Sequence, residues 1–297
     1  MISNNEILKN IAELETANSI RLQKYRRNLR KYLATPGINI DTLTANTASV
    51  GWDYTVNSFS DGNTLSPPSI NVIKSVIDTL VSKIATSKVR PFINTLNGSY
   101  KEMATALQAQ QFFDIFYEAQ NVHMTVSKAF EDACIFDTGA IYIDKDTCSI
   151  KKCLPWQVYV LPAELVYNKL TRAYYKQTDY PVTLLPEDIT KKFKKKVNYV
   201  DYGIYYDTFN KVKATIIAGH VVKTEPWDYD VLPFIFLYYS KPNIGTTSLS
   251  VVDILYTIQN EVDMLVSKIS AAAELTPGNT IFLPEGGSVK ATQLNNG

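Results

Sequence analysis

The sequence has 297 residues, of which 45% are hydrophobic and 20% charged, and 30 basic side chains nearly balance 29 acidic ones. This composition is typical of a folded globular protein and excludes a disordered chain, a collagen-like chain and a disulfide scaffold. The net charge of +1 also excludes a histone-like polycation. No apolar run approaches the ~18 residues of a membrane span, and the N-terminus lacks the basic-then-apolar order of a signal peptide. We therefore expect a chain made and at first kept in the cytosol, without a membrane partner.

The first predicted element is a long amphipathic helix from Glu6 to Leu33, which a Thr35-Pro36-Gly37 stop terminates. Its second half contains no acidic residue and six basic ones: Arg21, Lys24, Arg26, Arg27, Arg30 and Lys31. Such a run is either a solvated helix face or a contact with nucleic acid or with an acidic partner surface. Both interpretations stay open at this point.

A polar stretch over residues 38–65 is expected to form a long loop, and Ser66-Pro67-Pro68 is expected to open the next helix. Ser99 and Glu102 have the spacing of a capping box, which predicts a helix running to about Ala119. We expect this helix to bury five apolar side chains: Met103, Leu107, Phe113, Phe116 and Tyr117.

A further helix is predicted from Val122 to Phe136, and the hydrophobic period then changes from 3.6 to 2. Strands are predicted over residues 140–143, 157–160, 199–206, 213–222 and 234–239. Twelve of the 19 tyrosines lie between Tyr159 and Tyr239, which indicates a compositionally distinct β-rich module.

Within this module, Pro186-Glu187-Asp188 starts a predicted short helix that runs into five lysines: Lys191, Lys192, Lys194, Lys195 and Lys196. Acidic residues at the start and lysines at the end of a helix suit its dipole, and we favour this explanation. Contact of the lysines with phosphates is the alternative.

The last predicted helix runs from about Thr247 to Ala273 and is about 40 Å long, enough to cross a domain. Thr276-Pro277-Gly278 is expected to end it, and a strand, a turn and a second strand are expected over 280–289. The sequence stops soon after this second strand, at Gly297, which suggests a fragment of a longer protein.

The sequence contains no phosphate-binding loop, dinucleotide fingerprint, zinc-protease motif or nucleophile elbow. His123 and His220 are 97 positions apart, and each is more readily structural or exposed than catalytic. Cys134, Cys148 and Cys153 cannot all pair, so we expect reduced thiols, and a metal site at Cys148 and Cys153 lacks further ligands. We therefore predict no catalytic residue, metal or cofactor.

Several motifs nevertheless follow one another in an informative order. Lys88 to Thr95 forms an arginine, proline, aromatic, polar turn, and Ala133 to Ile143 contains an aliphatic, aromatic, x, x, Gly, Ala junction. Leu232-Pro233-Phe234, the run Lys241 to Leu249 and the run Ile258 to Asp263 come later. In this order the motifs resemble the wing region, and the re-entry from clip to stem, of tailed-bacteriophage portal proteins, over roughly residue 66 to the end.

The resemblance implies an elongated α+β subunit with a helical wing and stem and a β-rich insertion that contains the clip. The implied segments are a basic N-terminal helix (1–36), a wing-like helical region with a β segment (37–168), a stem- or clip-like β-rich module (169–240), and a long stem or channel-wall helix with the start of a further β region (241–297).

The resemblance also implies a structural protein of the virion, not an enzyme: a head-to-tail connector forming a homo-oligomeric ring, typically a dodecamer, at one capsid vertex. Such rings assemble in the host cytoplasm. Double-stranded DNA passes through the channel without sequence specificity during genome packaging and DNA ejection. The implied protein partners are a terminase motor, the major capsid protein and tail adaptor proteins.

On this resemblance, Lys191, Lys192, Lys194, Lys195 and Lys196 are candidates for the DNA channel or for the rim that docks the motor. The basic residues of the N-terminal helix are candidates for contact with DNA or a partner. A near-neutral chain suits a conduit, because a protein that grips many phosphates binds DNA too strongly to let it slide.

Two alternatives remain. The chain is either another phage head–tail connector or capsid-associated assembly protein without a DNA channel, or a nucleic-acid-modifying enzyme whose catalytic carboxylates the sequence does not single out.

Overall fold

The computed structural model describes residues 3–33, 38–39, 51–52, 70–88, 90–95, 98–167, 169–185, 198–241 and 248–275. These residues combine helices and sheets, which confirms the predicted α+β class. The helices are α1 (Asn4–Ala17), α2 (Ser19–Leu33), α3 (Val72–Ala85), α4 (Tyr100–Ala119), α5 (Val122–Phe136), α6 (Pro162–Val166), the 3-10 turn η1 (Val182–Leu184) and α8 (Val251–Leu275). The strands are β1 (Ile38–Asn39), β2 (Gly51–Trp52), β3 (Thr138–Asp144), β4 (Ser149–Cys153), β5 (Val158–Val160), β6 (Arg172–Pro181), β7 (Tyr199–Asp207), β8 (Val212–Ile217), β9 (His220–Pro226) and β10 (Phe234–Tyr238).

Two antiparallel sheets form the β-rich part of the molecule. One has the strand order β10-β3-β4 and the other the order β5-β6-β7-β8-β9. Aromatic side chains from both sheets share one buried cluster, which includes Tyr142, Tyr175, Tyr206 and Phe234. The hydroxyls of Tyr142 and Tyr206 lie 2.9 Å apart, so each of these buried hydroxyls has a hydrogen-bond partner. The richness in tyrosine therefore serves the packing between the sheets.

Helix α1 packs on the other face of the five-stranded sheet. Ile7, Ile11 and Leu14 are buried there against Tyr205 and Ala214. Because side chains alternate along a strand, Tyr205 of β7 faces α1 while its neighbours Ile204 and Tyr206 face the cluster between the sheets.

The predicted single helix from Glu6 to Leu33 is wrong, because the structure has two helices, α1 and α2, separated by Asn18. Asn18 is fully buried, and its amide nitrogen donates to the carbonyl oxygens of Leu14, at 2.7 Å, and Val160, at 2.8 Å. Asparagine competes in this way for backbone groups and interrupts a helix. The break lets α1 follow the sheet while α2 joins the helical part.

A second core joins the helices. Buried side chains of α2, α3, α5 and the start of α8 meet in one cluster, with Tyr25, Ile77, Phe136 and Val252 among its members. Helix α5 also continues through Asp137 into β3, so it links the helical core to the sheets.

Some predicted element boundaries need correction. Helix α3 begins at Val72, where Asn71 Oδ1 accepts a hydrogen bond from the Lys74 N–H, and the proposed Ser66-Pro67-Pro68 start lies outside the described residues. Helix α8 begins at Val251, four residues after the predicted start at Thr247, because residues 248–250 are not helical.

The β-rich part also differs from the predicted strands. The predicted strand 213–222 is a hairpin of β8 and β9, in which Ala218 and Gly219 have φ of 48° and 77°. Positive φ at both central residues is the geometry of a type I′ turn, which matches the twist of a hairpin. The prediction missed β4 and β6.

The sheets cross the predicted segment boundary between residues 168 and 169. Strand β5 lies before that boundary and β6 after it, and the two are paired from Val158 with Tyr175 to Val160 with Ala173. Among the described residues, the five-stranded sheet therefore draws strands from both sides of this boundary.

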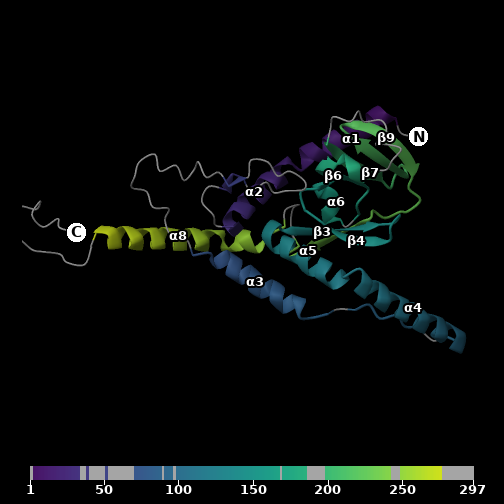
Figure 1. Cartoon of the computed structure of the whole chain (residues 1–297), viewed down its shortest axis with the longest axis horizontal. Helices are drawn as coiled ribbons and strands as arrows, with labels where there is room; N and C mark the ends of the chain where they lie inside the picture. Colours follow the sequence, from purple (N-terminus) through teal and green to yellow (C-terminus); the bar gives the residue numbers. More distant parts are fainter. Residues whose placement is uncertain are drawn as a thin grey trace, which may run out of the picture.

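Figure 1 shows that α8 and α4 extend from this body toward opposite ends of the molecule. At 1.5 Å per residue, the 20 residues of α4 span about 30 Å and the 25 residues of α8 about 37 Å. Within the described ranges no helix is both long enough and apolar enough to cross a bilayer.

Candidate functional site

A buried cluster of charges connects α2, the turn after α5 and the start of α8. Lys24 Nζ lies 2.8 Å from Asp137 Oδ2 and 2.9 Å from Asp253 Oδ2, and it also donates to the Ser248 carbonyl oxygen at 2.6 Å. The three side chains are only 13%, 4% and 8% exposed. Two carboxylates around one ammonium, all largely removed from water, make this joint specific in geometry and sensitive to the loss of any member.

The same cluster caps α8. The Ser250 N–H donates to Asp253 Oδ2 at 3.0 Å, and the Asp253 N–H donates to Ser250 Oγ, also at 3.0 Å. This reciprocal pair is a capping box with aspartate in the third position. Burial acts to raise the pKa of Asp253, but hydrogen bonds from Ser250 and the charge of Lys24 outweigh it, and the pKa lies below its ordinary value.

The basic face of α2 continues this contact along α8. Arg27 pairs with Asp253, and Lys31 Nζ donates to Asn260 Oδ1 at 2.6 Å. The cationic groups of Arg27 and Lys31 lie 5.3 and 5.4 Å from the centre of the Tyr256 ring, within the range of a cation–π interaction.

At least four of the six basic residues of α2 therefore contact other parts of the same chain. Besides Lys24, Arg27 and Lys31, the guanidinium of Arg21 donates to the Val158 carbonyl oxygen at 2.6 Å. Arg26 is half-buried and Arg30 is exposed. The basic face of α2 thus contacts an acidic residue of α8 in its own subunit. Contact of this face with nucleic acid or an external partner stays a prediction.

Gln259 fixes α8 to the start of α3. Its side chain is 1% exposed, and Oε1 accepts hydrogen bonds from the Val72 and Ile73 N–H groups at 3.0 and 3.4 Å. Its Nε2 donates to the Ile70 carbonyl oxygen at 2.8 Å. A side chain of α8 thus satisfies unpaired donors in the first turn of α3. No sequence pattern indicates this role, because glutamine is common on exposed helix faces.

Helix α4 forms an arm with the segment before it. The Ile93 N–H donates to Gln110 Oε1 at 2.8 Å, and Gln110 Nε2 donates to the Pro91 carbonyl oxygen at 3.1 Å. An Arg90 ion pair with Glu118 joins the segment to α4 near the body. The predicted capping box is present, with Glu102 Oε2 2.7 Å from the Ser99 nitrogen.

The predicted burial of the α4 side chains is wrong. No residue of α4 is buried, and Met103, Leu107 and Phe113 are 57%, 64% and 43% exposed. The exposed large apolar side chains of this helix are Tyr100, Met103, Leu107, Phe112, Phe113 and Ile115. The helix projects beyond the core, so an apolar pattern typical of a buried helix faces water.

Helix α8 has a similar exposed stripe. Its first turns are held by Val251, Val252 and Gln259, which are buried. Four of its large apolar side chains are 52 to 68% exposed: Ile254, Ile258, Leu265 and Ile269. We call these four residues the α8 stripe. A helix with one face fixed to the body and another apolar face in water has the form of an assembly surface.

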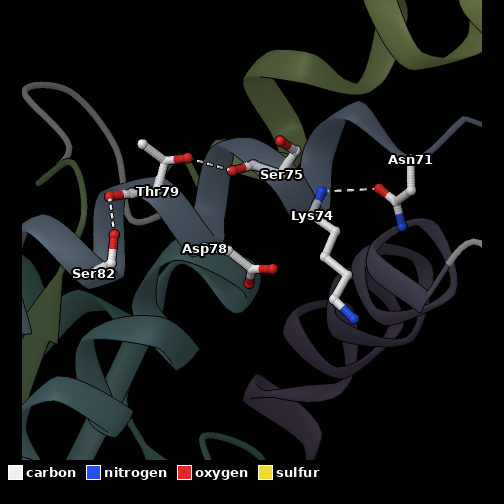
Figure 2. Close-up of a pocket in the computed structure, with 6 residues that line it drawn as sticks. All are labelled: Asn71, Lys74, Ser75, Asp78, Thr79 and Ser82. Atoms are coloured by element: carbon white, nitrogen blue, oxygen red, sulfur yellow. Dashed lines mark hydrogen bonds between the residues drawn. The ribbon is translucent and has the colours of Figure 1, made fainter.

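A shallow hollow of about 520 Å³ lies along α3, lined by Asn71, Lys74, Ser75, Asp78, Thr79 and Ser82. Figure 2 shows hydrogen bonds between these residues along α3 and its N-cap Asn71: Thr79 Oγ1 donates to the Ser75 carbonyl oxygen, Ser82 Oγ to that of Thr79, and the Lys74 N–H to Asn71 Oδ1. The lining contains no histidine or cysteine, and Lys74 and Asp78 are its two charged groups. This hollow does not resemble a catalytic site.

The histidines and cysteines are dispersed over the fold. His123 Nε2 lies 2.8 Å from the Ala85 carbonyl oxygen at the end of α3, a structural contact, and His220 is exposed at the start of β9. Cys134 and Cys153 are buried free thiols, and Cys148 is an exposed one. Burial raises the pKa of Cys134 and of Cys153 to about 12, so neither forms a thiolate readily. In the part of the chain that the structure describes, no group of three or more His, Cys, Asp or Glu side chains could hold a metal ion.

Several predicted features lie outside the described residues. They are the lysines Lys191, Lys192, Lys194, Lys195 and Lys196, the Thr35-Pro36-Gly37 and Thr276-Pro277-Gly278 stops, and the strands expected over 280–289.

No protein-family model matches the chain, and no curated protein matches its sequence.

Proposed function

We propose that this chain is the subunit of a homo-oligomeric ring, a structural protein that resembles the portal proteins of tailed bacteriophages. In this role the ring lies at a capsid vertex and forms a channel for DNA during packaging and ejection. It also docks a terminase motor, the major capsid protein and tail adaptor proteins. The observation that carries the proposal is the exposure of apolar side chains on two long helices that leave the body toward opposite ends.

Large apolar side chains exposed on two projecting helices favour an assembling protein. At ~200 Å² for an aromatic side chain, the exposed parts of Tyr100, Phe112 and Phe113 leave about 400 Å² of α4 in water. The exposed aliphatic side chains of α4 and the α8 stripe add to this area.

The positions of these surfaces favour a repeating assembly. A contact between two different surfaces of identical subunits is heterologous, and it generates a ring when the rotation between subunits closes. The charged joint and Gln259 hold α8 in a fixed direction relative to the body, which is what a constant rotation between subunits requires. The order of helices, β-rich insertion and long helix also agrees with the resemblance found in the sequence.

The main alternative is a head–tail connector or capsid-associated protein that assembles without a DNA channel. The same exposed helices support it, because they indicate that subunits associate but do not distinguish an assembly with a central channel from one without it. A nucleic-acid-modifying enzyme has weaker support, since the described residues present no converging carboxylates around a cavity.

Native mass spectrometry and negative-stain electron microscopy of the purified chain test the proposal. We expect a closed ring of identical subunits, typically twelve, with a central opening wide enough for duplex DNA. A monomer at micromolar concentration, or a monomer with metal-dependent nuclease activity, would contradict it. A closed assembly without an opening would favour the connector alternative.

A further inference from the structure

Strand β5 is an end strand of the five-stranded sheet, and its outer edge presents backbone groups in a regular order. The Lys176 N–H of β6 donates to the Gln157 carbonyl oxygen at 2.8 Å, so this carbonyl faces β6. The backbone groups of successive residues in an antiparallel strand point alternately to its two sides. The N–H and C=O groups of Val158 and Val160 therefore point away from β6, toward the outer edge.

The start of α2 lies along this edge and binds both outward carbonyls. Arg21 Nη2 donates to the Val158 carbonyl oxygen at 2.6 Å, and Asn18 Nδ2 donates to the Val160 carbonyl oxygen at 2.8 Å. Arg21 Nη2 also lies 3.4 Å from the Pro155 carbonyl oxygen, just before the strand. Side chains at the start of α2 thus occupy the place that a further strand would take.

The two end strands of this sheet differ in the protection that their own sequences provide. Edge strands of soluble proteins commonly carry lysine, proline or a bulge, which hinder pairing with another strand. Strand β9 contains Lys223 and ends at Pro226, and its pairing with β8 has a register shift. Strand β5 reads Val-Tyr-Val, three residue types favoured in strands, with no charge and no proline. Its protection must therefore come from another element.

We infer that Asn18 and Arg21, at the start of α2, guard the β5 edge and prevent the same edge of a second copy of this chain from pairing with it. Two such edges are complementary, because outward N–H and C=O groups match when one strand is turned antiparallel to the other. The inference goes beyond the proposed function and does not depend on it. The proposed ring would use the projecting helices, whereas the guard prevents association through the sheet.

The guard leaves part of its own hydrogen-bonding capacity unused. Arg21 Nε, Arg21 Nη1 and Asn18 Oδ1 are buried and have no hydrogen-bond partner among the described residues. Buried polar atoms without a partner cost free energy, so this cover is less favourable than a fully paired one. The loss of the bond from Arg21 to Val158 should therefore be enough to open the edge.

Arg21→Met tests the guard, because it removes the donor to Val158 and keeps an apolar side chain. We expect the peptide spanning residues 155–161 to exchange its amide hydrogens on the order of 10-fold faster than in the wild type, since a hydrogen bond from a charged donor is lost. Mass spectrometry measures this exchange. The variant should also form assemblies that bind thioflavin T, at a concentration at which the wild type forms none.

Two control variants accompany this test. Arg26→Met removes a half-buried arginine of the same helix whose Nε has no hydrogen-bond partner among the described residues, so it should behave like the wild type. Gly219→Ala strains the turn between β8 and β9, where φ is 77°, and shows what a loss of stability away from β5 does by itself. Arg21→Gln is a second test variant, because its shorter side chain stays polar but ends before the position of Nη2. It serves if circular dichroism shows that Arg21→Met is unfolded.

Faster exchange at 155–161 together with thioflavin-positive assemblies supports the guard. Unchanged exchange overturns it, because Arg21 then does not cover the edge. Faster exchange without such assemblies also overturns it, because an open edge that takes no strand needs no guard. Equal assembly by Gly219→Ala or Arg26→Met overturns it as well. Native mass spectrometry reports on the ring separately, so a wild type that stays monomeric contradicts the proposed function and leaves this test intact.

Discussion

At Gly139 the backbone of β3 passes so close to α5 that an added Cβ would lie 1.8 Å from the Ala129 carbonyl oxygen. The close approach follows directly from the turn at Asp137, which has φ of 90° and ends α5. The carboxylate of Asp137 belongs to the charged joint, so the same turn serves both the sheet and the position of α8.

The first prediction concerns this glycine. Gly139→Ala should lower the free energy of unfolding by about 2 kcal/mol or more, because α5 and β3 must move apart to admit the methyl group. Urea denaturation measures the change. Gly219→Ala is the control: its position has open space around it and φ of 77°, so it should lose only about 1 kcal/mol of backbone strain. Equal losses at the two sites would contradict the steric explanation.

The second prediction concerns the buried carboxyl of Asp132 and the pH dependence of the free energy of unfolding. Burial raises the pKa of its carboxyl to about 6, although Lys152 Nζ lies 2.7 Å from Oδ2 and acts in the opposite direction. Between about pH 4 and pH 6 the folded chain keeps a proton that the unfolded chain loses, so the stability falls as the pH rises through this window.

Replacing Asp132 with Asn removes that dependence. From pH 4 to pH 7 the stability of Asp132→Asn should improve relative to the wild type by about 2 kcal/mol, measured by urea denaturation at each pH. Asp146→Asn should differ from the wild type only below about pH 4, because Lys213 holds the pKa of that exposed carboxyl below its ordinary value and the wild type loses this contribution as the pH falls. A constant difference between Asp132→Asn and the wild type would contradict the assignment.

At the scale of elements, the joint between α2 and α8 determines where the longest helix points. Lys24 sits between Asp137 and Asp253, and the capping box of Ser250 fixes the first turn. The spacing Ser-x-x-Asp could have indicated from the sequence where α8 begins. The sequence could not have indicated that Lys24 is the partner of Asp253, because this lysine lies more than 220 positions earlier.

Lys24→Met should therefore destabilise the chain by about 3–5 kcal/mol, because two largely buried carboxylates lose their shared cation. Hydrogen exchange should rise in the first turn of α8 before it rises elsewhere. Arg172→Met is the matched control, since the ion pair of Arg172 within the described residues is with the exposed Glu13, at 3.3 Å, and its loss should cost less than about 1 kcal/mol. A loss for Lys24→Met as small as that of the control would show that the joint does not stabilise the fold.

Helix α4 shows why element prediction and burial prediction differ. Its start, its end and its capping box follow from local sequence and were predicted correctly. Its apolar side chains were expected in a core, yet none is buried. A helical pattern shows that a face needs a partner, but not whether the partner belongs to the same chain.

At the scale of the whole molecule, near-neutral charge suits a passage for DNA better than a site that holds it, and the lysine cluster concentrates positive charge locally. In a ring, one lysine of each subunit becomes a circle of positive charge.

Replacing Lys191, Lys192, Lys194, Lys195 and Lys196 with glutamine should impair DNA packaging or motor docking while the far-ultraviolet circular dichroism spectrum stays the same. The matched control replaces five exposed lysines on other elements: Lys9, Lys74, Lys83, Lys128 and Lys151. Packaging efficiency in a complementation assay is the measurement. Unchanged packaging with the first set, or equal impairment with both sets, would refute a specific role for the cluster.

The sequence by itself determined the α+β class, the position of most helices and strands, and the tyrosine-rich β part, because these depend on local spacing of apolar residues and on turns. Only the tertiary structure decided that Asn18 divides the first helix, that the basic face of α2 meets α8, and that α4 projects into water. Each of these depends on contacts between residues far apart in the chain, such as Asn18 with Val160 and Lys24 with Asp253. Local periodicity carries no information about which distant group will be the partner.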